Sequence, residues 1–167
     1  MRRLVVAAAV AAGLTGTGAG AQDSVVRLPS LTMEAAVKAA TAAMADCRKR
    51  GALVAVSVTD RAGQVLALLR DPLAGMHVAE TATRKAWTAA SFRSPTTELE
   101  KATGPSTPNG GIRHLPGVAM VGGGLPVEAA GALVGAIGVS GAPSGQLDDE
   151  CARTGIDAIQ MDLEMGS

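Results

Sequence analysis

The stretch LPGVAMVGGGLPVEAAGALVGAIGVSGAPSGQLDDEC, residues 115–151, decides the fold of this chain. It predicts a strand, a glycine turn at 122–124, a second strand, a tight turn at 128–131, a third strand and the start of a helix. No Gly-Lys-Ser/Thr follows the three glycines, and a strand rather than a helix comes next. The glycine run is therefore interpreted as a hairpin turn and not as a phosphate-binding loop.

The third strand of this unit has two different faces. Larger side chains are expected on one face, which carries Leu133, Ile137 and Val139. The other face is expected to carry Val134, Ala136 and Gly138. Because glycine in a strand often marks a close approach of another backbone, a helix should pack tightly on this second face.

The rest of the chain alternates helical and strand patterns. A helix is expected over 32–50, with Thr32 as N-cap and Gly51 after its end. Strands at 53–59 and 64–70 flank turn residues 60–63, and helices are expected over 76–92, from 94 and from about 148 to 161. The segment 103–116 shows no periodicity. This order predicts an α+β fold with a five-stranded, mainly antiparallel sheet packed with helices.

The N-terminus has the pattern of a secretory signal peptide over residues 1–21. Arg2 and Arg3 precede a short apolar run, and Ala19-Gly20-Ala21 fits a small-residue cleavage site. The run is too short to span a bilayer. We therefore expect a single mature domain, 22–167, that is periplasmic or secreted and has no membrane attachment after cleavage.

Composition excludes some partners. The chain of 167 residues has 15 basic and 15 acidic residues, so loss of Arg2 and Arg3 leaves a slightly acidic protein. Such a protein lacks the basic surface expected of a nucleic-acid binder. Its only aromatic side chains are Trp87 and Phe92, so the core must pack mostly small residues.

Two cysteines in an exported chain are able to form one disulfide. Cys47 lies near the end of the first expected helix and Cys151 near the start of the last, each on the apolar side. Antiparallel helices on one sheet face would bring these ends together. We predict a Cys47–Cys151 disulfide, with two buried thiols as the alternative.

Standard catalytic signatures are not found in the sequence. Residues 138–142, GVSGA, lack the last glycine of a nucleophile elbow, and no H-E-x-x-H or C-x-x-C is present. The acidic run 148–150 is interpreted as the charged start of a helix. The sequence therefore favours a binding protein over an enzyme.

Three segments resemble the GlcG/HbpS-like haem-binding domains, also called the haem-degrading family. They are RKAWTAASF at 84–92, GGGLPV at 122–127 and GALVGAIGVSGAPSGQLDDECA at 131–152. The hairpin VTDRAG at 58–63 also fits the family pattern, and the resemblance extends from about Leu31 to Ile159. It implies a profilin-like sandwich, frequently assembled into homo-oligomers, and a haem-binding function.

The resemblance directs attention to two histidines as ligands for haem iron or another metal, His77 first and His114 second. Arg84 and its neighbour Lys85 are candidates for a propionate, and Trp87 is a candidate for stacking on the porphyrin. Without a C-x-x-C-H motif, the expected cofactor is haem b, held non-covalently. The alternatives are surface or loop-anchoring roles for the histidines, solvated helix positions for Arg84 and Lys85, and a core or subunit-interface role for Trp87. The protein would then be a periplasmic accessory protein that binds a partner, or a binder of another small molecule.

Overall fold

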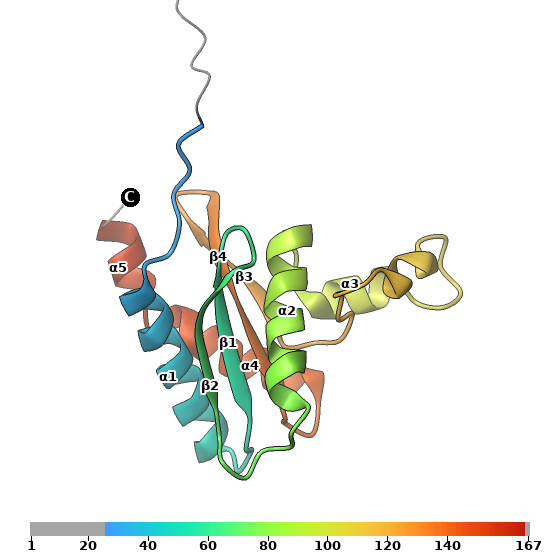
Figure 1. Ribbon diagram of the computed structural model, residues 1–167, viewed down its shortest axis with the longest axis horizontal. Helices are drawn as coiled ribbons and strands as arrows, with labels where there is room; N and C mark the ends of the chain where they lie inside the picture. The colour runs from blue at the N-terminus through green and yellow to red at the C-terminus, as the bar shows by residue number, and fades with distance from the viewer. Residues whose placement is uncertain (1–25, 166–167) are drawn as a thin grey trace, which may run out of the picture.

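The computed structural model describes residues 26–165, so the predicted signal peptide lies outside the described residues. Its chain forms an α+β fold in which helices cover both faces of one sheet (Figure 1). The strands are β1 (Ala55–Asp60), β2 (Val65–Arg70), β3 (Gly124–Ala129) and β4 (Ala132–Ser140). They pair in the order β2-β1-β4-β3, and every pairing is antiparallel.

The sheet has four strands in the described chain, so the prediction of five was wrong. The strand expected before the glycine turn, around 115–121, is not formed. Two backbone donors in or next to this segment bond to side chains from elsewhere in the sequence. The Ala119 N–H donates to Thr88 Oγ1 at 2.9 Å, and the Gly122 N–H donates to Glu100 at 3.3 Å. A backbone satisfied in this way makes no strand ladder.

Helices lie on both faces of the sheet. α1 (Met33–Lys49) and α4 (Gly145–Asp157) pack together on one face, and α2 (Val78–Phe92) covers the other (Figure 1). α3 (Thr96–Ala102) and the 3₁₀ helix η1 (Gly110–His114) follow α2, and α5 (Gln160–Met165) ends the described chain. None of the helices among residues 26–165 has the length and apolarity to cross a membrane.

Local signals in the sequence explain where the first elements begin and end. The Thr32 hydroxyl accepts the Ala35 N–H at 3.2 Å and caps α1, as predicted. Gly51 and Gly63 have φ of +75° and +79°, which favours glycine after α1 and in the β1–β2 turn. α3 differs from the prediction, because Pro95 rather than Ser94 is its N-cap residue.

A β-bulge changes which side chains of β4 face the main core. Val127 pairs with Gly135 and Glu128 with Leu133, so Val134 has no partner on β3. The extra residue turns Val134 toward the α1 and α4 side, where it joins Ile137 and Val139. The expected alternation therefore fails at Leu133 and Val134 and holds from Ala136 onward.

The small face of β4 receives α2, as predicted. A Cβ on Gly138 would lie 2.1 Å from the Ala82 carbonyl oxygen and 2.6 Å from the Ala86 nitrogen. Ala136 packs beside Ala89 and Ala90. The helix backbone therefore approaches the sheet more closely than any residue with a side chain at position 138 would allow.

The predicted disulfide is present in the structure. Cys47 of α1 and Cys151 of α4 are joined, with their Cα atoms 5.5 Å apart and a sequence separation of 104. Both cysteines are fully buried in the core cluster. The bond ties the C-terminal end of α1 to the middle of α4, the two helices that cover one face of the sheet.

Candidate functional site

A cavity of about 420 Å³ opens beside the first turn of α2. Four parts of the chain form its walls: the start of α2 with the preceding loop, the loop before β3 at Val121, the end of β4 with its following loop, and the first turn of α4. His77, Thr81 and Lys85 come from the α2 side. Ser140, Ser144 and Asp148 come from the opposite side. Sequence segments more than 50 residues apart therefore meet around this cavity.

His77 occupies the mouth of the cavity and is exposed. It is the N-cap residue of α2, and its carbonyl oxygen accepts a hydrogen bond from the Thr81 hydroxyl at 3.0 Å. The imidazole lies over Gly75, because a Cβ there would come within 2.9 Å of the ring Cε1. Among the described residues, neither ring nitrogen has a hydrogen-bond partner, so the ring is available to a ligand.

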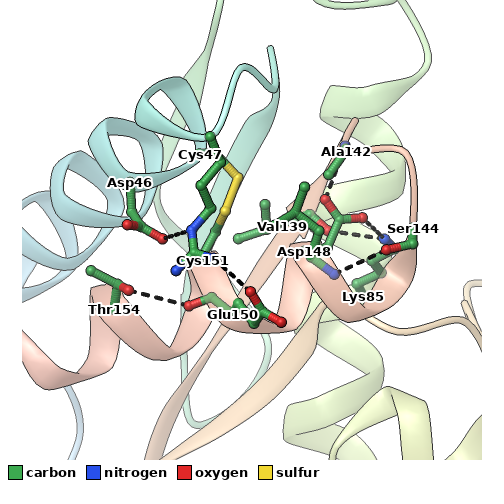
Figure 2. The surroundings of a disulfide bond; sticks show 12 residues. Asp46, Cys47, Lys85, Val139, Ala142, Ser144, Asp148, Glu150, Cys151 and Thr154 are labelled. Carbon is green, nitrogen blue, oxygen red and sulfur yellow. Dashed lines mark hydrogen bonds and ion pairs between the residues drawn. A yellow bond between two sulfur atoms is a disulfide. The ribbon is translucent and has the colours of Figure 1, made fainter.

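The floor of the cavity holds a buried ion pair between two helices. Lys85 Nζ lies 2.8 Å from Asp148 Oδ2 and donates to the Val139 carbonyl oxygen at 2.9 Å. Each of the two charged residues is only 3% exposed. Figure 2 shows the pair between α2 and the first turn of α4, next to the hydroxyl of Ser144.

Further hydrogen bonds fix Asp148 in place. Its Oδ1 accepts the Ala142 N–H at 3.1 Å, while Ser144 caps α4 by accepting the Leu147 N–H at 3.2 Å. Burial raises the pKa of the Asp148 carboxyl, and the Lys85 ammonium acts in the opposite direction. The pair therefore joins α2, β4 and α4 through charges that lie almost entirely away from water.

The glycine turn beside this region is held by side chains from α3 and α4. Thr96 Oγ1 accepts the Gly124 N–H at 2.8 Å. Asp149 accepts the Gly123 N–H at 2.6 Å and also bonds to the Thr97 hydroxyl. The acidic run was interpreted as a charged helix start, but all three of its members also hold other parts of the chain, since Glu150 pairs with Arg50 at 2.6 Å.

The structure gathers only part of the predicted site in one chain. His77 and Lys85 line the cavity, whereas Arg84, Trp87 and His114 do not. Arg84 is exposed and pairs with Glu80 at 2.5 Å, as its spacing of four residues predicts. His114 ends η1 and is exposed. Within residues 26–165, no group of three or more His, Cys, Asp or Glu side chains is placed to hold a metal ion.

Trp87 lies far along the same helix. It is ten residues after His77, which is about 15 Å along a helix axis. Its indole packs against two glycines, since a Cβ on Gly63 would meet Cδ1 at 2.7 Å and one on Gly117 would meet Cζ3 at 3.9 Å. The tryptophan therefore contacts the β1–β2 turn and the loop before β3, and it can join a His77 site only through a large ligand or a second copy of the chain.

Reasoning from the sequence missed the Lys85–Asp148 pair, although a signal for the lysine exists. Val78, Ala82, Lys85 and Ala89 follow one another at helical spacing, and all four are buried. A lysine in the middle of such a stripe must find a partner, since an unpaired buried charge is very costly. The identity of the partner depends on a contact 63 residues away and has no local signal.

Comparison with known proteins decides the family. A family model described as haem degrading protein HbpS-like matches residues 31–157. The chain belongs to the HbpS-like family. The crystal structure of HbpS is 43% identical, with a TM-score of 0.77, over 81% of this chain and 94% of that one.

Two further relatives extend the HbpS-like comparison. The crystal structure of a PduOC:haem complex is 32% identical, with a TM-score of 0.73, over 78% of this chain and 95% of that one. An uncharacterised 15.0 kDa protein from the dhaT-dhaS intergenic region of Citrobacter freundii is 32% identical over 135 residues, 80% of this chain and 94% of its own length. These likenesses support the four-stranded α+β fold across most of the chain.

Proposed function

We propose that this chain is an exported protein that binds haem b non-covalently, with His77 as the iron ligand. The observation that carries the proposal is the placement of His77. It is an exposed imidazole without a hydrogen-bond partner among the described residues, at the mouth of a cavity of about 420 Å³. Membership of the HbpS-like family and likeness to a protein crystallised with haem support it.

Exposed apolar side chains for a porphyrin are present in the segment just before His77. Met76 is 92% exposed and Leu73 is 81% exposed, the two highest values among the large apolar side chains of the described chain. Exposure of such side chains is unfavourable, and a flat apolar ligand would cover them. The residues present therefore fit the group: His77 for the iron, and Met76 and Leu73 for the ring.

The charged residues near His77 suggest how propionates are held. Arg84 is half-exposed and already pairs with Glu80, so it would meet a propionate by exchanging one carboxylate for another. Lys85 is fully engaged by Asp148 and Val139 and contributes to the shape of the site rather than to direct binding. Haem, when bound, supplies redox chemistry of its iron, and the protein would act as a carrier, buffer or sensor.

Assembly into a homo-oligomer belongs to the same proposal. β2 forms one edge of the sheet, and its Val65 and Leu68 are each 46% exposed. An edge strand with apolar side chains favours pairing with another chain. Such assembly would allow His114 or Trp87 of a second copy to complete the site. Light scattering of the mature protein tests the proposed oligomer. Leu68→Lys is the variant expected to dissociate it.

Titration of the mature protein with haemin tests the function. We expect a saturable Soret band with a fixed stoichiometry per chain. Met76→Ser should weaken binding, whereas Met161→Ser, at a methionine that is 72% exposed on α5, should not. Absence of saturation, or equal effects of both substitutions, would contradict haem binding at the start of α2.

The mass of the intact exported protein tests the proposal of export. We expect a mass that lacks residues 1–21, and a mass that retains them would contradict it.

A further inference from the structure

A second cavity, of about 580 Å³, lies away from His77 and shares no lining residue with the first. It is bounded by the segment leading into α1, the first turn of α1, the β3–β4 turn and α5. Its volume falls within the range of small-molecule sites, roughly 300–1,000 Å³. The proposed haem site uses none of these elements.

Small side chains at the centre of the lining make this region hollow. Ala35 of α1, Ala129 of β3 and Ala132 of β4 line it, and Ala129 and Ala132 face each other across the hairpin. The leading segment is fixed over them, because the Leu31 N–H donates to the Val134 carbonyl oxygen at 2.9 Å. The space is therefore partly open to solvent but lined by elements that are anchored to the sheet.

The polar groups around this cavity are at its rim and are largely engaged. The Thr32 hydroxyl accepts the Ala35 N–H, and Asp162 is paired with Lys38 at 2.8 Å. The remaining walls are Leu31, Val134, Leu163 and alanines, with Pro29 and Ser30 at the entrance. A charged group entering here would lose its hydration without gaining a free counter-ion, which is costly. The surroundings therefore select a neutral ligand.

We propose that this cavity binds a neutral apolar small molecule, or the apolar part of one, with at most one hydrogen-bonding group at the rim. The affinity would come from apolar area removed from water between α1, α5 and the β3–β4 hairpin. Ser30 is the residue placed to meet the polar group, because its hydroxyl has no partner among the described residues. This site is separate from the proposed haem site and independent of it.

Fluorescence of the neutral probe N-phenyl-1-naphthylamine tests the proposal on the mature protein. We expect one saturable site per chain. Ala35→Phe fills the cavity and should weaken binding by at least about tenfold, equivalent to about 1.4 kcal/mol. Val37→Phe adds the same side chain to α1 at an exposed position outside the cavity and should leave binding unchanged. Equal affinity of Ala35→Phe and the wild type would overturn the proposal.

Further measurements locate the probe within the cavity and establish the class of ligand. Ala132→Leu fills the cavity from β4 and should also weaken probe binding. Circular dichroism establishes that each variant is folded. Unchanged probe binding by a folded Ala132→Leu variant would count against the site. Equilibrium dialysis with haemin should leave probe uptake unchanged, and competitive displacement would mean that both ligands share one site. Decanol should displace the probe better than decanoate, and the reverse order would overturn the neutral class.

Discussion

The two faces of the sheet are stabilised in different ways. On the α1 and α4 face, aliphatic side chains such as Val56, Val58 and Ile137 form one apolar cluster, and the Cys47–Cys151 disulfide crosses it. On the α2 face, most of the contact surface is made of glycine, alanine and hydroxyl side chains, with Val78 as a larger apolar member. The buried Lys85–Asp148 pair closes one end of it.

This difference separates the polar part of this small domain from its apolar, covalently tied part. The apolar, covalently tied face has little that could bind a polar ligand. The α2 face carries polar groups whose burial is costly, and the cavity beside His77 opens at its end. Buried charges retained at such a cost frequently mark functional regions. The predictions below perturb each face in turn.

Breaking the buried ion pair should have the largest effect on stability. Asp148→Ala leaves the Lys85 ammonium buried without a counter-ion, which we expect to cost about 3–5 kcal/mol of unfolding free energy. Urea denaturation followed by circular dichroism measures this. The matched control is Glu80→Ala, which unpairs the neighbouring but exposed Arg84 and should cost no more than about 0.5 kcal/mol.

A double substitution sharpens the same prediction. Lys85→Met together with Asp148→Leu removes both charges, and such apolar replacements are frequently neutral or stabilising by about 1–4 kcal/mol. We expect the double variant to regain most of the stability lost in Asp148→Ala. If it is as unstable as the single variant, the hydrogen bonds of the pair to the Val139 carbonyl oxygen and from the Ala142 N–H, and not the opposite charges, hold this end of the fold.

Loss of the disulfide should weaken the opposite face. Replacing Cys47 and Cys151 by alanine releases a loop of 104 positions, for which we expect a loss of about 2–5 kcal/mol. Denaturation of the oxidised wild type beside this variant measures the loss. Thiol titration of the unfolded, unreduced wild type should find no free cysteine, and two free thiols would refute the bond.

The close approach of α2 predicts a smaller effect at Gly138. Gly138→Ala places a methyl group against the backbone of Ala82 and Ala86, so the helix must move, at an expected cost of about 1–3 kcal/mol. Gly111→Ala is the matched control, since nothing lies within 4 Å of the added Cβ. Thermal melting of both variants should therefore separate them clearly.

Lowering the pH should remove a still smaller contribution to stability, made by the ion pair between Arg48 of α1 and Asp71. A hydrogen bond from the Arg48 guanidinium lowers the pKa of Asp71 in the folded protein. The stability that this hydrogen bond contributes is fully present above the ordinary pKa of about 3.8. It is lost as the pH falls through the lowered pKa of the folded protein. Asp71→Asn should be less stable than the wild type at pH 7, and the difference should shrink toward pH 3. A constant difference would contradict the linkage.

Local sequence patterns were sufficient for much of the fold. Thr32 and Gly51 mark the ends of α1, and Asp60 to Gly63 form the turn of the first hairpin. The disulfide followed from two apolar stripes on helices expected to be antiparallel. Each of these features depends on residues close in sequence or on the regular repeat of a helix.

Long-range contacts explain what the sequence did not predict. Residues 118–121 have strand-like composition, but the hydroxyl of Thr88 and the carboxylate of Glu100 take backbone donors in this region. Val134 changed faces because of a bulge, which depends on β3. His77 was identified as a candidate from its position before a helix, whereas its cavity depends on the β4–α4 loop, more than 60 residues away.

The central claim is that His77 is the haem ligand, and the haem spectra of His77→Ala and His114→Ala, measured in parallel, test it most directly. The account predicts that His77→Ala loses the Soret shift and most of the affinity, while His114→Ala keeps the wild-type spectrum or is weakened only slightly. Gly75→Ala moves the imidazole without removing it, so its haem affinity should lie between those of the two histidine variants. A wild-type spectrum and affinity in His77→Ala would contradict the claim, and loss in His114→Ala alone would transfer the iron to the η1 loop.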